Sequence, residues 1–455
     1  MHTKMIQELR AAIGAGNVIA DRTRLTSYSY DGQREQAVPD AVVTVHSAGQ
    51  VAAAVKIASA YRVPVVARGA GSGMTGGSIP ARGGIVLNFE RMNQILELNR
   101  EDRICRVQPG VVTADFQRLA ERHGLFYPPE PASAAFSTLG GNVAESAGGL
   151  GCVKYGLTKD FVAGLEFVTA DGSIVRTGVL GGCASPFNVG DILTGSEGML
   201  GIITEIALRM IPLPEKRITM LALFATLPEA ASASNAILDS GVIPSVLEFM
   251  DKSCIEAVRE YAGVAIPENA GAALIAEVDG TREQAALEQA VVLETIGKRT
   301  PLDLVSAETA KERDALWKLR KSISPAIARI APVKFNEDVS VPLSRIPELC
   351  AFVEELSRRR NLRVVTFGHS GDGNIHVNFM AHWDDTEELA RVHEGIEELF
   401  RKAVALGGTL SGEHGIGLTK RPYIGIALNP ATIAFEQSIK RAFDPSETLN
   451  PGKMF

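Results

Sequence analysis

Three histidines and one glutamate lie in two short glycine-flanked stretches near the carboxyl end of the chain. His369 and His376 occur in NLRVVTFGHSGDGNIHVNFM, where two β-rich runs flank the turn signature SGDG and predict a hairpin. Residues seven apart on one strand point to opposite faces, but across a hairpin two imidazoles can reach the same face. Glu413 and His414 are adjacent in SGEHGIG.

Two imidazoles and a carboxylate form a donor set for a divalent metal ion with an open coordination position. Zinc is the first expectation, and manganese or iron are alternatives. A lone histidine is more often structural. However, three of the chain's eight histidines fall in these two motifs, which favours a metal site.

Cationic residues that could bind an acid precede this region. A helix is expected over 309–324, ending before Pro325, and Ser324 lies one turn beyond Arg320, so the two can share a face and hold one carboxylate. Lys334 opens the next expected strand. The alternative is a solvated basic helix face, which is the usual meaning of a charge run.

A glycine-dense peptide follows a strand-like run in VVARGAGSGMTGG, at 65–77. Glycines can turn successive backbone N–H groups inward to hold phosphate oxygens, although a flexible surface loop is the alternative. The formal G-x-G-x-x-G in this peptide lacks Rossmann context, because the expected helix at 50–62 precedes it and a strand at 84–89 follows it. A phosphate cradle of another architecture is predicted.

A second glycine-dense region spans 128–156 and shows little periodicity, so we expect a long functional loop that approaches a flat, extended ligand. The alternative is a set of tight turns packed on a sheet. After PLPEK at 212–216 the glycine density falls, and an α+β domain with helices on one face of an antiparallel sheet is expected.

The 455 residues carry a net charge of −7, which favours neither nucleic acid nor an anionic membrane as partner. No apolar run approaches the roughly 18 residues of a membrane span, and the N-terminus lacks a signal-peptide core, so a cytoplasmic protein is expected. No two of the five cysteines have C-x-x-C spacing, which argues against an iron–sulfur cluster and predicts mostly buried thiols. The cysteines are Cys105, Cys152, Cys183, Cys254 and Cys350.

Several of these stretches together resemble a known family. The glycine-rich segments 68–77 and 137–156, TGSEG at 194–198 and the tail DPSETLNPGK at 444–453 are similar to the FAD-binding domain of the vanillyl-alcohol-oxidase superfamily. Within it, the whole chain resembles the D-2-hydroxy-acid dehydrogenase branch, which includes D-lactate dehydrogenase, the glycolate oxidase flavoprotein subunit and D-2-hydroxyglutarate dehydrogenase.

The resemblance implies a two-part FAD-binding domain at 1–213, an antiparallel-sheet cap covered by helices at 214–418, and a C-terminal segment at 419–455 that returns to the first domain. The first loop would hold the FAD pyrophosphate, and the second would lie along the ribityl chain and isoalloxazine. The first loop lacks histidine and cysteine, which favours non-covalent FAD. The residues expected to bind FAD are Arg68, Gly69, Ala70, Gly71, Ser72, Gly73, Gly76, Gly77, Pro131, Thr138, Gly140, Gly141, Asn142, Ser146, Gly148, Gly149, Tyr155, Gly156, Glu197, Gly198, Ile203 and Asn450.

In the family, the histidines of G-H-x-G-D-G-N-x-H and the glutamate of E-H-G bind a divalent metal, and they match His369, His376 and Glu413. His414 matches the general base. The family's arginine, hydroxyl and lysine for the substrate carboxylate match Arg320, Ser324 and Lys334. Relatives acting on hydroxyglutarate commonly have threonine in place of the serine, which leaves the acid's identity open.

The implied reaction is FAD-dependent oxidation of a D-2-hydroxy acid, such as lactate, glycolate or 2-hydroxyglutarate, by hydride transfer to flavin N5. The metal would assist deprotonation of the hydroxyl by His414. Electrons would pass to a quinone through an iron–sulfur partner, to an electron-transfer flavoprotein or to a cytochrome, and a homodimer is expected. The alternatives are a non-catalytic flavoprotein relay subunit and a non-redox flavin-dependent transferase.

Overall fold

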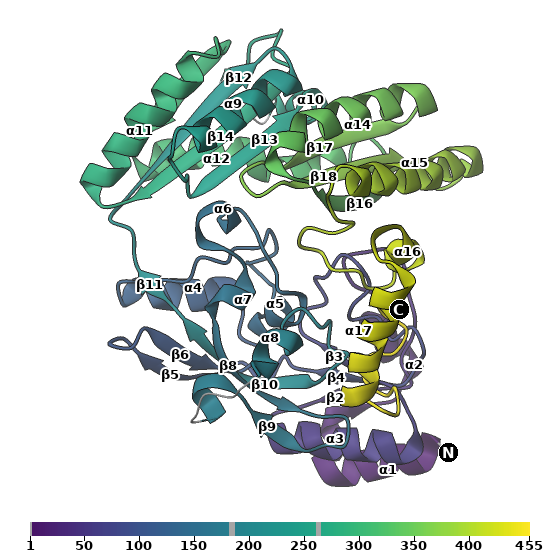
Figure 1. Ribbon diagram of the computed structural model, residues 1–455. Helices are drawn as coiled ribbons and strands as arrows, with labels where there is room; N and C mark the ends of the chain where they lie inside the picture. Colours follow the sequence, from purple (N-terminus) through teal and green to yellow (C-terminus); the bar gives the residue numbers. More distant parts are fainter. Residues whose placement is uncertain (1, 182–186, 261–264) are drawn as a thin grey trace. The chain divides into compact units, whose positions relative to one another are not determined.

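The computed structural model describes residues 2–181, 187–260 and 265–455, and the chain divides into two compact units (Figure 1). Unit 1 contains Met1–Gly148, Leu157–Leu213 and Glu413–Phe455, and unit 2 contains Gly149–Gly156 and Pro214–Gly412. Relative to the expected segments, residues 149–156 group with unit 2 and residues 413–418 with unit 1. Cys183 lies outside the described residues.

Unit 1 begins with a four-stranded sheet in the order β1-β2-β4-β3, in which only β1 is antiparallel to its neighbour. The helix α3 begins after Ser47, whose hydroxyl accepts from the backbone N–H of Gln50, and α1 packs against α3 (Figure 1). The glycine peptide runs from β3 into β4, as expected, so no Rossmann helix follows it. The elements are α1 (His2–Ile13), β1 (Val18–Ile19), α2 (Arg22–Leu25), β2 (Ala41–Thr44), α3 (Ala48–Tyr61), β3 (Val65–Arg68) and β4 (Ile85–Asn88).

A second sheet of unit 1 has five antiparallel strands in the order β5-β6-β10-β8-β9, and β7 and β11 pair separately. The rings of Phe116 and Phe161 pack edge-on against Tyr127, which is fully buried. The elements are β5 (Ile95–Asn99), β6 (Ile104–Val107), α4 (Thr113–Arg122), β7 (Leu125–Phe126), α7 (Thr158–Phe161), β8 (Val162–Val168), β9 (Ile174–Arg176), α8 (Val189–Leu193), β10 (Ile202–Arg209) and β11 (Ile211–Pro212).

The expectation that 128–156 is a long loop without secondary structure is wrong, because two short helices form in it. These are α5 (Leu139–Glu145) and α6 (Cys152–Tyr155). Glycine disfavours helix, but the α5 N-terminus is capped by Thr138, and a Cβ at Gly140 would lie 2.4 Å from Pro109 Cβ. Close packing therefore requires glycine in this helix.

The C-terminal segment of unit 1 folds onto the first sheet. Leu449 forms a parallel bridge with Val65, and the fully buried Asp444 accepts hydrogen bonds from Thr448 and Leu449. The helices here are α16 (Ile424–Ala427) and α17 (Pro430–Phe443).

Unit 2 is built on a seven-stranded sheet in the order β15-β12-β14-β13-β17-β18-β16, with every neighbouring pair antiparallel. The hairpin expected at 361–380 is confirmed, because β17 and β18 pair across residues 370–373. The strands are β12 (Lys216–Phe224), β13 (Val246–Asp251), β14 (Ala272–Gly280), β15 (Asp303–Ala307), β16 (Val333–Ser340), β17 (Arg363–His369) and β18 (Asn374–Ala381).

Helices cover both faces of this sheet, so the expectation of helices on one face is wrong. One face packs Leu221, Ile275 and Phe367 against helices α10, α12 and α13 in a single apolar cluster. Because strand side chains alternate, the intervening residues face the other helices, among them α9 and α15. The helices are α9 (Leu227–Asp239), α10 (Lys252–Val258), α11 (Arg282–Gly297), α12 (Ala310–Lys321), α13 (Ile323–Ile327), α14 (Ile346–Arg360) and α15 (Thr386–Ala405).

The helix expected over 309–324 ends earlier, at Lys321, and a separate helix, α13, contains Pro325. Proline fits there because the first-turn N–H groups of a helix have no intrahelical acceptor, so its missing N–H removes no bond. Among the described residues, no helix is long and apolar enough to cross a membrane.

Candidate functional site

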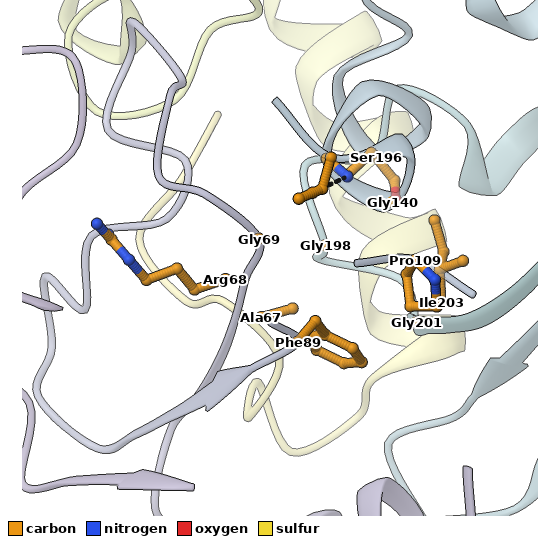
Figure 2. A pocket seen from close by; sticks show the side chains of 13 residues that line it. Ala67, Arg68, Gly69, Phe89, Pro109, Gly140, Ser196, Gly198, Gly201 and Ile203 are labelled. Carbon is orange, nitrogen blue, oxygen red and sulfur yellow. Dashed lines mark hydrogen bonds between the residues drawn. The ribbon is translucent and has the colours of Figure 1, made fainter. Parts of the chain in front are cut away.

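A cavity in unit 1 is lined by the ends of β3, β4 and β10 and by α5 (Figure 2). Seven of the residues expected to bind FAD line it, namely Arg68, Gly69, Thr138, Gly140, Gly141, Gly198 and Ile203. Six more lining residues were not in the predicted set: Ala67, Phe89, Pro109, Ala144, Ser196 and Gly201. The two predicted glycine-rich segments thus meet at one cavity of unit 1, although they are separated by about seventy residues in the sequence.

Glycine is required at several points around this cavity. A Cβ on Gly69 would lie 2.1 Å from Thr138 Oγ1, and Gly71 and Gly76 have φ values of +68° and +85°. Residues other than glycine rarely adopt such backbone angles. The loop therefore has stretches of backbone without side chains, which is the feature expected of a cradle for phosphate groups.

The Arg68 side chain supports the loop. Its guanidinium donates to the Tyr30 carbonyl at 2.6 Å and to Ser78 Oγ at 3.3 Å, and it points away from the other labelled residues in Figure 2. Asn450 joins two loops, since its amide donates to the carbonyls of Gly77 at 2.8 Å and Glu197 at 2.6 Å. These contacts hold the glycine peptide in shape.

Glu197 lies in the same region of unit 1 and binds the backbone of residues 416–417. Its carboxylate accepts from the backbone N–H groups of Ile416 at 2.7 Å and Gly417 at 2.9 Å. Its φ of +50° is unusual for a residue other than glycine, and Ser146 and Asn450 share this conformation, with φ of 50° and 42°. Such strain collects at functional sites.

Other predicted cofactor residues have structural contacts. Asn142 is buried and donates to Thr113 Oγ1 at 2.8 Å. Tyr155 belongs to unit 2, where its hydroxyl donates to Asp279 at 2.7 Å. The remaining predicted residues lie in the first loop, at Ala70, Ser72, Gly73 and Gly77, or in the second region, at Pro131, Gly148, Gly149 and Gly156.

The two hairpin histidines meet on one face of the unit 2 sheet. His369 pairs with Asn374, and His376 pairs with Phe367, so both imidazoles project to the same side. Their Nε2 atoms lie 3.4 Å apart, with the rings perpendicular at 87°. Both side chains are buried.

The chain leaves unit 2 at the peptide bond between Gly412 and Glu413. Gly412 is held in unit 2 because its N–H donates to the Asp338 carboxylate at 2.9 Å. The ligand atoms of Glu413 and the histidines His369 and His376 all lie within 4.8 Å of one another. This donor set suits a divalent cation of the zinc, manganese or iron class.

His414 lies in unit 1, where its carbonyl accepts from Thr75 Oγ1 of the first glycine loop at 3.0 Å. The next residue, Gly415, has φ of +80°, and a Cβ there would lie 2.7 Å from carboxylate oxygens of Glu145 and Glu197. The E-H-G motif needs its glycine for this approach.

Arg320 is paired within unit 2, because its Nε donates to Glu248 at 2.8 Å while its guanidinium lies 4.5 Å from the centre of the Phe367 ring. Lys334 lies four residues before Asp338 on β16 and therefore on the same face of the sheet as Asp338 and His376. Burial lowers the pKa of Lys334, and its ammonium has no hydrogen bond or ion pair with any residue in the described ranges. Ser324 is exposed on α13.

Three carboxylates of unit 2 were not among the site residues predicted from the sequence: Glu248, Asp338 and Asp279. Each is fully or almost fully buried, and Glu248 and Asp279 lie on strands that are otherwise largely apolar, whereas the strand of Asp338 contains other polar residues. A buried acid inside such a strand could have been noticed as a signal, since burying a charge is unfavourable without a partner. The partners themselves are distant in sequence.

A solved structure titled p-cresol methylhydroxylase with substrate bound has the same fold, with a TM-score of 0.81, 19% identity, and coverage of 99% of this chain and 96% of that chain. The fold and the glycine-lined cavity define a flavoprotein of the vanillyl-alcohol-oxidase type. Residues 39–178 match the family described as FAD binding domain, and residues 213–454 match FAD linked oxidases, C-terminal domain. The chain belongs to the FAD-linked oxidases and is an oxidoreductase.

Curated relatives match over nearly the full length. Glycolate oxidase subunit GlcD of Bacillus subtilis is 40% identical, with 94% of this chain and 92% of that protein covered. D-lactate dehydrogenase of Anaerostipes hadrus is 34% identical, covering 92% and 90%. D-2-hydroxyglutarate dehydrogenase of Stutzerimonas stutzeri is 32% identical, covering 99% and 98%.

Proposed function

We propose that this protein oxidises a D-2-hydroxy acid to the corresponding 2-oxo acid, with FAD as the acceptor of the hydride from C2. Relatives at 32–40% identity carry the names of enzymes for three such acids. The structural observation that carries the proposal is Lys334, a half-buried ammonium for which the described residues supply no anion. A buried charge without a partner is unfavourable, so an anionic ligand is the expected partner.

The residues divide into groups that bind and groups that move a proton. When bound, FAD supplies the hydride acceptor, and a divalent metal held by His369, His376 and Glu413 supplies a Lewis acid for the 2-hydroxyl. His414 accepts the hydroxyl proton while the C2–O bond becomes a carbonyl. The acid thus loses one proton and one hydride, which together amount to two hydrogen nuclei and two electrons.

The cations position the acid. Lys334 binds a carboxylate as a point charge, and Arg320 offers its terminal nitrogens because its Nε is already bonded to Glu248. Fixing the acid in this way brings C2 to a reactive orientation, which lowers the barrier through positioning. Ser324 would add a hydroxyl donor only after a local change, since it is exposed on α13.

Repeated turnover would require a separate electron acceptor, for which a quinone reached through an iron–sulfur partner, an electron-transfer flavoprotein and a cytochrome are the candidates. A relay subunit without its own chemistry would not need the buried histidine pair or Lys334. A flavin-dependent transferase is the other alternative, and it would be favoured if none of the acids bleached the flavin.

The proposal is tested by anaerobic mixing of the FAD-loaded protein with D- and L-lactate, glycolate, malate and D- and L-2-hydroxyglutarate. We expect one D-acid, or the achiral glycolate, to bleach the visible flavin band, and a chelator to abolish the bleaching. If the flavin stays oxidised with every acid, in protein shown to contain metal, the proposal is overturned. Bleaching that survives complete metal removal would remove only the metal from the mechanism.

A further inference from the structure

Glu248 occupies a position between the histidine pair and the arginine, all within unit 2. It lies on β13 directly opposite His369 of β17 in the strand register. One carboxylate oxygen accepts a hydrogen bond from His369 Nδ1, and the other accepts from Arg320 Nε at 2.8 Å. The Glu248 side chain has 0% exposure, so both bonds are shielded from water.

The first bond determines which nitrogen of His369 can bind a metal. A carboxylate accepts but does not donate, so Nδ1 carries the hydrogen and the lone pair is on Nε2. That Nε2 faces Nε2 of His376 at 3.4 Å. Glu248 therefore directs the lone pair of His369 to the place where a shared cation would bind.

The second bond determines which edge of Arg320 is available. The Nε is bonded to Glu248, and the guanidinium plane is held over the Phe367 ring at 4.5 Å. The terminal Nη nitrogens have no hydrogen-bond partner among the described residues. A guanidinium held in this way presents two N–H groups to a carboxylate without reorganising.

We infer that Glu248 is a positioning residue that couples the metal-binding histidine to the acid-binding arginine. This inference deepens the proposed function and rests on it. Because one carboxylate makes both bonds, a change at Glu248 must weaken metal binding and acid binding together, even though Glu248 touches neither ligand.

Glu277 provides a matched control on the neighbouring strand β14. It is also buried and lies on the same face, but its carboxylate accepts from Thr219 Oγ1 at 2.5 Å and Trp317 Nε1 at 3.1 Å. It has no role in the proposed mechanism. A general loss of stability from removing a buried charge would affect both positions.

The test measures Zn²⁺ binding to FAD-loaded, metal-stripped wild-type protein, Glu248→Gln and Glu277→Gln, by competition with a chromophoric chelator. A glutamine amide accepts through a single oxygen, so the Glu248→Gln variant cannot keep both bonds. We expect the Zn²⁺ dissociation constant to rise about 10- to 100-fold for Glu248→Gln, and to stay within about twofold for Glu277→Gln. FAD content should be equal in all three proteins.

Equal Zn²⁺ affinity in wild type and Glu248→Gln would overturn the inference while leaving the proposed reaction intact. If wild type itself binds no Zn²⁺, the metal in the proposed function fails first. Glu248→Asp, which withdraws the carboxylate by one methylene, serves if the glutamine variant does not fold, and it should also weaken Zn²⁺ binding. Failure of both variants to fold would make Glu248 a stability residue and overturn the inference.

Discussion

Lys334 and Arg320 carry their charges in different ways on the same face of the unit 2 sheet. Arg320 is paired with Glu248 and stacked on Phe367, whereas burial lowers the pKa of Lys334, which has no anionic partner in the described chain. The unpaired cation should therefore destabilise the fold slightly while strengthening the binding of an acid. Such opposition between stability and function is common at binding sites.

Replacing Lys334 with Met keeps the length of the side chain but removes the charge. We expect KM for the oxidised acid to rise about 10-fold or more, because a hydrogen bond to a charged group contributes roughly 1.5–3 kcal/mol. The free energy of unfolding should stay equal or rise. Steady-state kinetics and urea titration measure the two effects, with Lys318→Met, an exposed residue of α12, as control.

An unchanged KM for Lys334→Met would show that the acid does not contact this residue. Lower stability together with unchanged KM would instead make Lys334 a structural residue.

At the scale of elements, the hairpin and the segment at 411–412 meet through Asp338. This residue pairs with His376 across β16 and β18, and it accepts from Ser411 Oγ at 3.2 Å and Gly412 N at 2.9 Å. A Cβ at Gly412 would lie 1.8 Å from Asn374 Nδ2, so this segment is tightly packed on the hairpin. Asp338 therefore holds the segment that leads directly to Glu413.

Asp338→Asn should loosen residues 411–414, because the amide has no negative charge and offers one acceptor oxygen in place of the two that bind Ser411 and Gly412. We expect kcat to fall about 10-fold or more, since misplacing catalytic groups by about an ångström lowers rates strongly. Hydrogen exchange of a peptide covering 411–414 should rise, while FAD content stays unchanged. Ser411→Ala removes only the hydroxyl bond and should have a smaller effect in both measurements.

Unchanged hydrogen exchange in that peptide with Asp338→Asn would contradict this role. A lower kcat with unchanged exchange would indicate that Asp338 acts on His376 instead.

On the scale of the whole molecule, residues 149–156 belong to unit 2 although unit 1 residues flank them on both sides. Asp279 holds this segment: it accepts from Lys154 Nζ at 2.7 Å and from the Tyr155 hydroxyl at 2.8 Å, and its side chain is 2% exposed. Because Gly149, Tyr155 and Gly156 are expected to bind FAD, we expect the contacts of Asp279 to affect both the stability of unit 2 and the retention of FAD.

Asp279→Ala should release residues 149–156, because it removes the carboxylate that binds Lys154 and Tyr155 and leaves the Lys154 ammonium only the backbone carbonyl of residue 279. We expect the free energy of unfolding to fall by about 2 kcal/mol, less than the roughly 3–5 kcal/mol typical of a fully buried pair because Lys154 is 20% exposed. FAD should dissociate faster, as measured by flavin fluorescence after dilution. Asp314→Ala, an exposed change on α12, is the control.

If FAD release is unchanged while stability falls, residues 149–156 do not contribute to cofactor retention. If neither changes, the Asp279 contacts are dispensable.

Local sequence patterns predicted several local structures of this protein. The SGDG turn and its two β-rich flanks predicted the hairpin that brings His369 and His376 together, and the glycine peptide was predicted to join two strands without a Rossmann helix. These two predictions of local structure succeed because turn chemistry and side-chain alternation act between residues close in the sequence. The family resemblance, carried by motifs of the same kind, extended them to FAD.

Only the tertiary structure shows which residues hold the site residues in place. Glu248 lies 121 residues from His369, and Asp279 lies 125 residues from Lys154, so no local pattern links them. Likewise, α5 forms despite its glycines because Gly140 packs against Pro109, and helices cover both faces of the sheet because both faces are apolar. Strand register and close packing are set by contacts between distant segments, which sequence periodicity does not encode.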